Sequence, residues 1–321
     1  VYLLRGYSKV MFGIQESGLL SALKRESEDY MFFVESDANT SQDSSFFYNT
    51  KNESFTVIQR SPGGDFQEYP LSLEDLRTML LNQIAKGQPR GMARKEFIPN
   101  LAGNYIIVNN ETGEFSGTGQ TTDGYKGIEA MPEFPRVLSE DADNGITYDV
   151  KNWFSFSGAS LFTKISTNYP KFHSLLRKAG LSDDKLYKYK FISDNEYYTV
   201  LMPSAQALDS ANVNAMPVDE LRDFLQLHFV QGEIIFTDGS SSAGYYETKR
   251  LDEKSTEYTK IFTKIYLKPG IDIIEIPSAS GGNYVEINEA GSSTNILTAV
   301  LQGTGQERFN VMFNNAVIHE I

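Results

Sequence analysis

An amphipathic helix pattern occurs twice in this chain and limits the folds open to it. Residues 216–232 read MPVDELRDFLQLHFVQG, with an apolar stripe at Leu221, Phe224, Leu225, His228 and Phe229. This i, i+3, i+4, i+7, i+8 spacing marks one face of a helix. Residues 71–87 read LSLEDLRTMLLNQIAKG and repeat the stripe at Leu76, Met79, Leu80, Gln83 and Ile84. Both segments begin acidic, which complements the helix dipole, and the final glycines, Gly232 and Gly87, are predicted to be helix C-caps.

Three further pairs of segments repeat in the same order. They are residues 19–25 with 172–178, 32–38 with 200–206, and 144–150 with 315–321. The first pair predicts short helices and the second an apolar strand that enters a polar turn. The third pair predicts a hairpin turn and an alternating strand. Four ordered matches predict two domains, residues 1–156 and 157–321.

The later part of each half is rich in strand signals. Residues 105–108 precede an Asn- and Gly-containing turn, and residues 284–287 and 296–301 are further predicted strands. Helices followed by strands within each half predict an α+β fold class.

Composition excludes several classes of partner. The 321-residue chain has a net charge of −13, and both halves are acidic. Nucleic acid and anionic lipid need a basic face, so neither is expected as a partner. No apolar run approaches the roughly 20 residues that cross a bilayer, so no transmembrane segment is expected. Cysteine is absent, which excludes disulfides, cysteine-ligated metals and thiol nucleophiles.

The second half carries a resemblance to a known family. Residues 198–207, YTVLMPSAQA, predict a strand that ends in a Pro-Ser-x-x-Ala turn. Residues 225–232, LQLHFVQG, contain a Leu-x-x-His-x-Val-x-Gly pattern, and residues 315–321, NAVIHEI, close the chain. In this order the three segments resemble the fasciclin, or FAS1, family, including its bacterial cell-surface members.

The first half resembles the family only through the internal repeat. Gln83 stands where His228 does, Tyr148 where His319 does, and Glu35 where Pro203 does, and a polar stretch at 40–68 lengthens one connection. The resemblance implies two FAS1-like domains, the first of them divergent. Each would have N-terminal helices packed on a wedge-shaped β-sandwich, and the implied role is extracellular adhesion or ligand binding.

The three histidines are the natural candidates for a catalytic or metal site. We interpret them as structural. His228 lies on the apolar helix stripe and His319 alternates with apolar strand residues, so both are expected to be buried and hydrogen-bonded to the backbone. His173 is expected to be an exposed helix residue. Because the first half has Gln83 and Tyr148 instead, we expect no catalytic residue, no metal ion and no cofactor.

Other motifs do not assemble an active site. No Gly-x-Ser-x-Gly occurs, and the turns predicted at 117–122 and 303–306 lack the Lys-Ser/Thr end of a phosphate loop. Residues 140–145 lack the distal glutamate of a calcium loop and are expected to form a solvated turn. Four aromatic residues could stack on sugar rings or belong to the core, namely Tyr245, Tyr246, Tyr258 and Trp153.

We therefore expect a non-catalytic module of an exported protein that binds an extracellular protein or glycan. It would lie at the cell surface or, in a bacterium, in the periplasm or on the outer membrane, with an upstream lipid anchor as one option. The alternatives are a carbohydrate-active enzyme, which would need two carboxylates facing each other across a cleft, a small-ligand carrier of the cell envelope, and a structural spacer.

Overall fold

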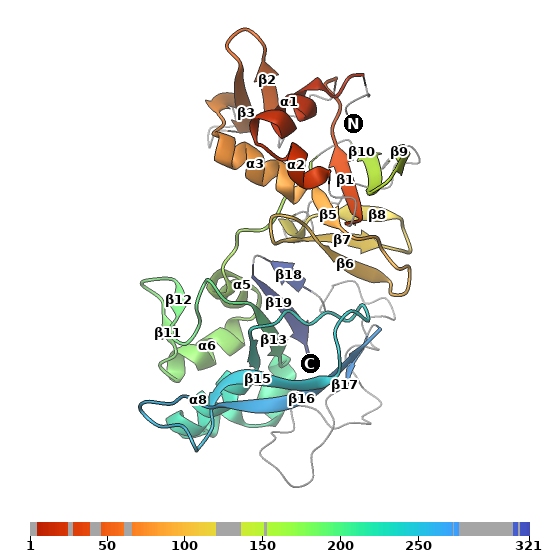
Figure 1. The fold of residues 1–321 in the computed structure, drawn as a ribbon. Helices are drawn as coiled ribbons and strands as arrows, with labels where there is room; N and C mark the ends of the chain where they lie inside the picture. Colours follow the sequence, from red (N-terminus) through yellow and green to blue (C-terminus); the bar gives the residue numbers. More distant parts are fainter. Residues whose placement is uncertain are drawn as a thin grey trace. The chain divides into compact units, whose positions relative to one another are not determined.

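The structure, a computed structural model, describes residues 5–24, 28–38, 46–60, 66–119, 136–150, 153–271, 273–275, 311–313 and 315–321. The chain divides into two compact units, Val1–Ser157 (the first unit) and Gly158–Ile321 (the second unit) (Figure 1). Both mix helices and strands, so the predicted α+β class is confirmed. The predicted strands at 284–287 and 296–301 and the glycine-rich turn at 303–306 lie outside the described residues.

The first unit contains three described sheets. Its helices that lie wholly within the described residues are α1 (Ser8–Glu16), α2 (Leu20–Leu23) and α3 (Leu73–Asn82). One sheet has the order β5-β1-β10-β9, formed by β1 (Tyr30–Val34), β5 (Ile84–Lys86), β9 (Arg136–Ala142) and β10 (Gly145–Asp149). The second comprises β2 (Phe46–Asn49), β3 (Ser54–Arg60) and β4 (Phe66–Pro70). The third comprises β6 (Lys95–Pro99), β7 (Tyr105–Asn109) and β8 (Glu114–Ser116).

The second unit is built on one larger sheet. Its helices are α5 (Leu161–Asn168), α6 (Pro170–Lys178), α7 (Ala205–Ser210), the 3₁₀ helix η1 (Val213–Ala215) and α8 (Val218–Leu227). The sheet order is β17-β16-β15-β14-β13-β19-β18, with β13 (Tyr198–Met202), β14 (Phe229–Gln231), β15 (Gly244–Leu251), β16 (Phe262–Gly270), β17 (Ile273–Glu275), β18 (Val311–Phe313) and β19 (Ala316–Glu320). A separate two-stranded hairpin is formed by β11 (Ser182–Asp183) and β12 (Lys188–Tyr189).

The two units share a three-strand centre. In the first unit β1 pairs with β10 in parallel and with β5 in antiparallel, and in the second β13 pairs likewise with β19 and β14. Phe33 lies opposite Tyr148 and its N–H donates to the Gln83 carbonyl, while Leu201 lies opposite His319 and donates to the His228 carbonyl. The strand register therefore confirms that Gln83 corresponds to His228 and Tyr148 to His319.

The predicted match of residues 19–25 with 172–178 is wrong, because α6 corresponds to α1. In both helices the C-cap residue is followed by a glycine of positive φ, Gly18 at 69° and Gly180 at 70°. The next residue's N–H then reaches back to a carbonyl five positions earlier, from Leu19 to Ile14 and from Leu181 to Leu176. This capping arrangement fixes the alignment of the two helices independently of their side chains.

The repeated long helices end earlier than their stripes predicted. α8 ends at Leu227 and α3 at Asn82, and each is followed at once by a short strand, β14 or β5. Gly232 and Gly87, predicted as helix C-caps, instead follow these strands with φ of 86° and 100°. The last apolar residues of each stripe leave the helix because their backbone groups complete the central sheet.

A glycine in the first unit is required by close strand contact. A Cβ atom on Gly145 would lie 2.0 Å from the Tyr30 carbonyl oxygen, and its φ is 143°. Gly145→Ala is expected to lower the free energy of unfolding of the first unit by about 2–4 kcal/mol, through backbone strain and overpacking. Ala316 occupies the corresponding register position of the second unit, so Ala316→Gly should cost about 1 kcal/mol or less. Urea unfolding measures the stability of both variants, and an equal loss of stability in the two would contradict the prediction.

Candidate functional site

His228 is a buried residue at the end of α8. It is the C-cap of that helix and is 1% exposed. Its Nδ1 lies 2.8 Å from the Phe224 carbonyl oxygen, one turn back. The Phe172 and Phe224 rings lie edge-on to it, with centroid separations of 5.8 and 4.7 Å. The prediction that His228 is buried and bonded to the backbone is confirmed.

His319 is buried to the same degree in β19. Its exposed fraction is 1%, and its Nε2 lies 2.8 Å from the Ile235 carbonyl oxygen. Burial lowers the pKa of both His228 and His319 to about 4, although their backbone hydrogen bonds act in the opposite direction. Both rings are therefore neutral at physiological pH and hold a loop or helix end in place. The predicted structural environment of His319 is also confirmed.

The residues at the corresponding positions of the first unit also support the backbone. The Gln83 side chain donates to the Phe154 carbonyl at 3.1 Å and accepts from the Phe154 N–H at 2.9 Å. Tyr148 stacks on Phe33, with centroids 5.2 Å apart and ring planes 15° apart. The corresponding side chains thus contact different segments: Gln83 holds the backbone of Phe154, whereas His228 bonds a carbonyl of its own helix.

The prediction that His173 is exposed is wrong. It is half-buried on α6, with Nδ1 3.0 Å from the Tyr189 hydroxyl and its ring 5.2 Å from that of Phe162. Burial lowers its pKa despite the nearby carboxylate of Asp184. The α6 stripe alone could not reveal this, because the covering residues come from α5 and the β11–β12 hairpin.

A buried ion pair occupies the first unit at the position of Pro203. Glu35 is fully buried, and its Oε2 lies 2.7 Å from Lys9 Nζ and accepts the Trp153 indole N–H at 2.6 Å. Trp153 itself is only 2% exposed, so it is a core residue and cannot stack on a sugar ring. No local pattern in the sequence predicts this cluster, because its three residues are separated along the chain.

Exposed tyrosines are present on the β15–β16 hairpin of the second unit, and also elsewhere at Tyr69, Tyr187 and Tyr197. Tyr245 is 61% exposed and lies opposite Tyr266, and the two rings meet edge-on with centroids 5.1 Å apart. The next pair on this face is Glu247 and Lys264, joined by a 3.2 Å ion pair. Tyr246 points the other way and is buried. Successive side chains of a strand point to opposite faces, so Tyr245 is a candidate binding residue whereas its neighbour Tyr246 belongs to the core.

The loop of this hairpin presents a further aromatic residue. Tyr258 is 93% exposed, and Leu251 and Ile261 at the loop's base are 44% and 41% exposed. The loop is held by its own hydrogen bonds. Ser255 Oγ donates to the Ile261 carbonyl at 2.7 Å and accepts the Ile261 N–H at 2.9 Å, and Thr256 is linked to Thr259. We call Leu251, Ile261, Tyr245, Tyr258 and Tyr266 the hairpin surface.

Two glycine- or acid-rich segments have structural explanations. Gly117 packs against the chain so closely that a Cβ would lie 2.0 Å from the Ser155 carbonyl oxygen. The predicted hairpin turn is therefore wrong at Gly117–Gly119, which pack along residues 155–157; residues 120–122 lie outside the described part. Residues 140–142 continue β9, so the predicted solvated turn is confined to Asp143 and Asn144.

Within the described ranges, no group of three or more His, Cys, Asp or Glu side chains is placed to hold a metal ion. None of the described helices is both long and apolar enough to span a bilayer.

Comparison with known proteins gives a similarity to solved structures. No family model matches the chain, and no curated protein matches it. A solved structure, described as a novel fold revealed by a FAS1 domain pair from the insect cell adhesion molecule fasciclin I, is similar at 11% identity. The match covers 98% of this chain and 95% of that one, with a TM-score of 0.29. A TM-score of this size assigns no fold.

Proposed function

We propose that the chain is a non-catalytic binding module made of two FAS1-like domains, residues 1–156 and 157–321, that acts outside the cell at its surface. The repeated parallel pairing of β1 with β10 and β13 with β19 supports a common fold for both. The burial of His228 and His319 against backbone carbonyls supports a structural use of these residues. In this proposal the helices of each domain cover a wedge-shaped β-sandwich.

The hairpin surface is the observation that carries the binding function. It combines exposed tyrosines, a residue type suited to contacts that are both apolar and hydrogen-bonding, with a loop already ordered by its own hydrogen bonds. Pre-ordering reduces the entropy lost on binding. Leu251 and Ile261 add exposed aliphatic area, which favours a protein partner over a glycan. In β15 and β16 the only carboxylate is Glu247, already paired with Lys264, so the two strands do not offer the carboxylate pair of a glycosidase.

Substitution of the exposed tyrosines tests this proposal. The chain would be screened against immobilised extracellular matrix proteins and a glycan array. The double variant Tyr245→Ala/Tyr258→Ala is expected to weaken binding to any partner found by about tenfold or more, since exposed aromatic anchors dominate such interfaces. Its stability should change by no more than about 0.5 kcal/mol.

Tyr187→Ala is the matched control. Tyr187 is 71% exposed in the same unit but belongs to a different hairpin, between β11 and β12. Its substitution should leave binding unchanged. A chain that binds nothing in either screen, or a double variant that binds as tightly as the parent, would refute the assignment. Binding only to glycans would replace the protein partner with a carbohydrate.

A further inference from the structure

The β11–β12 hairpin of the second unit ends in a turn that is both apolar and basic (Figure 1). The turn consists of Lys185, Leu186, Tyr187 and Lys188, which we call the basic tip. All four side chains are exposed, that of Leu186 by 62% and that of Tyr187 by 71%. The basic tip therefore presents two large apolar side chains to solvent between two cations.

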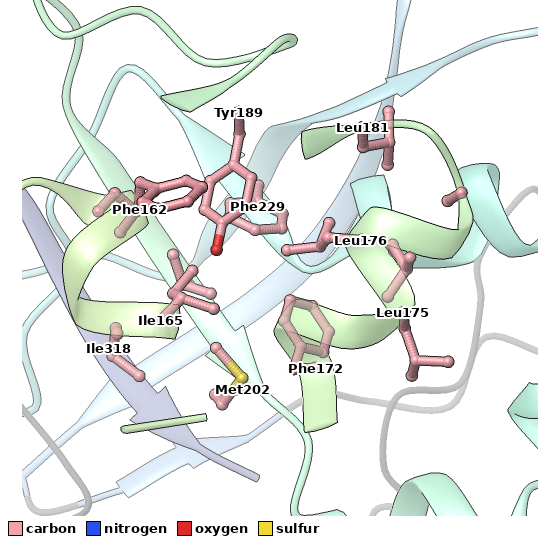
Figure 2. Close-up of a cluster of buried hydrophobic side chains, with 14 of the residues drawn as sticks. Phe162, Ile165, Phe172, Leu175, Leu176, Leu181, Tyr189, Met202, Phe229 and Ile318 are labelled. Atoms are coloured by element: carbon pink, nitrogen blue, oxygen red, sulfur yellow. The ribbon is translucent and has the colours of Figure 1, made fainter. Parts of the chain in front are cut away.

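The core of the second unit anchors the base of this hairpin. Leu181, just before β11, and Tyr189 of β12 are buried in the same cluster. Figure 2 shows the Tyr189 ring beside that of Phe162, and the two centroids are 5.2 Å apart. The Lys190 N–H donates to the Leu181 carbonyl at 2.9 Å. The base of the hairpin is thus fixed without a binding partner.

The turn itself is also ordered. Asp183 Oδ1 accepts the Leu186 N–H at 3.2 Å. Asp184 Oδ2 lies 2.7 Å from Arg177 Nε on α6. Tyr187 adopts a φ of 50°, in a region that residues other than glycine rarely occupy. Strained positions of this kind cluster at ligand-binding segments, so the outward presentation of Leu186 and Tyr187 is a candidate binding feature.

The local charge at this hairpin is opposite to that of the whole chain. Residues 170–190 contain six Lys and Arg side chains and two Asp. Both aspartates already bind groups of the second unit itself. Lys185 and Lys188 form no ion pair within the described residues. The net charge of each half argued against an anionic lipid partner, whereas the charge at this hairpin favours one.

The loop of the β15–β16 hairpin provides the contrast. It exposes an aromatic residue, Tyr258, and two lysines, Lys254 and Lys260. Residues 252–260 also contain three carboxylates, which outnumber these lysines. An anionic surface would repel this loop and attract the basic tip.

A bilayer with anionic headgroups matches both properties of the basic tip. Tyrosine favours the membrane–water interface, and lysine side chains can extend along apolar surface while their charge stays among the headgroups. Anionic lipids attract cations at short range, since the Debye length is about 8 Å at physiological salt. The acidic charges beyond that distance are largely screened. Leu186 would gain little from an acidic polysaccharide, which favours a bilayer.

We propose that the basic tip docks on a bilayer that contains anionic phospholipid. Leu186 and Tyr187 enter the headgroup region, and Lys185 and Lys188 lie among the phosphates. This contact is peripheral and does not involve the hairpin surface.

Cosedimentation of the full chain with lipid vesicles tests the proposal. The chain is expected to bind phosphatidylcholine vesicles that contain phosphatidylglycerol, and not vesicles of phosphatidylcholine alone. One lysine near an anionic bilayer changes the partition coefficient about fivefold, so Lys185→Gln/Lys188→Gln should weaken binding about 25-fold. The matched control Lys254→Gln/Lys260→Gln removes two exposed lysines from the acidic loop and should leave vesicle binding unchanged.

A fluorophore at each loop identifies the residue that enters the bilayer. The emission of Tyr187→Trp should shift to shorter wavelength when anionic vesicles are added, because the indole moves to a less polar environment. The emission of Tyr258→Trp should not shift. Trp153 is buried in the first unit and contributes the same background to both variants.

Three results would overturn the proposal. They are equal effects of the two lysine pairs, absence of any preference for the anionic vesicles, and binding of the basic tip to soluble heparin but not to vesicles, which would identify an acidic polysaccharide as the partner instead. The Tyr245→Ala/Tyr258→Ala variant should bind anionic vesicles as the parent does. Loss of the bilayer contact and loss of a protein partner are therefore measured separately.

Discussion

Acidification from pH 7 to 4.5 is expected to unfold the second unit while the first unit remains folded. The three histidines of the chain all belong to the second unit, and two of them, His228 and His319, are buried with pKa values of about 4. The corresponding residues of the first unit, Gln83 and Tyr148, do not gain a proton in this pH range. The two units should therefore differ sharply in acid stability.

The direction in which the free energy of unfolding changes with pH follows from proton binding. An unfolded histidine has a pKa of about 6.5, so between pH 6.5 and 4 the unfolded chain takes up protons that the folded unit excludes. The free energy of unfolding then falls as the pH falls, and levels off below pH 4. Each histidine contributes about 3 kcal/mol to this loss. Two of them approach the whole stability of a typical domain, about 5–15 kcal/mol.

The chain carries its own reporters for the two units. Trp153, the only tryptophan, lies in the first unit, so its fluorescence follows that unit alone. The imidazole proton signals of the histidines follow the second. Urea unfolding at pH 7, 5.5 and 4.5 should show the histidine midpoint falling steeply and the tryptophan midpoint changing much less. Parallel movement of both midpoints would contradict the prediction.

His228→Gln provides the matched variant, because glutamine is the residue that the first unit uses at this position. The variant loses some stability at pH 7, since the hydrogen bond to Phe224 is not reproduced in full. Its slope of stability against pH between 6.5 and 4 should become clearly shallower, because only His319 and His173 then remain as histidines whose pKa is lowered by burial. An unchanged slope would exclude His228 as a source of the acid sensitivity.

Lys9→Met is expected to destabilise the first unit by about 3–5 kcal/mol. The substitution leaves the Glu35 carboxylate buried without its cation, and an uncompensated buried charge is among the most destabilising changes in a protein core. Unfolding in urea, followed by Trp153 fluorescence, measures the loss directly. The Trp153 indole donates to the same carboxylate oxygen, so its emission in the folded state should change as well.

The repeat supplies the control for this prediction. Lys171 takes the place of Lys9 in the second unit, but it is more exposed and bonds Asp209 and the Ala205 carbonyl at the surface. Lys171→Met should cost no more than about 1 kcal/mol. The double variant Lys9→Met/Glu35→Gln should regain much of the stability that Lys9→Met loses, since no buried charge remains. Equal losses for the two lysine variants, or no recovery in the double variant, would show that the ion pair is not decisive.

The sequence predicted those parts of the fold that depend on local patterns. The helix stripes located α3 and α8, the apolar runs located β1 and β13, and the histidines of the second unit were placed correctly except His173. The same patterns misplaced the helix ends, because the stripe continues into β5 and β14 without a change in hydrophobicity. Only pairing with β1 or β13 turns those residues into strands.

The remaining features depend on contacts between distant segments. Nothing local distinguishes Tyr245 from Tyr246; the strand register and the core on one side decide which of them is exposed. The ion pair of Lys9 with Glu35 likewise joins segments that are separated in the chain. The structural correspondence of α1 with α6 is shown only by their shared capping bonds, because the two helices differ in sequence at most positions.

The parallel pairing at the centre of each unit has a consequence for biosynthesis. Tyr30 pairs with Gly145 and Tyr198 with Ala316. The parallel partner of β1 or β13 is therefore translated more than a hundred residues after that strand. Until that partner emerges from the ribosome, each half exposes an unpaired edge of apolar side chains. Folding should be slow for the chain length, and nascent chains that stop short of either closing strand should be preferred substrates for chaperones and proteases.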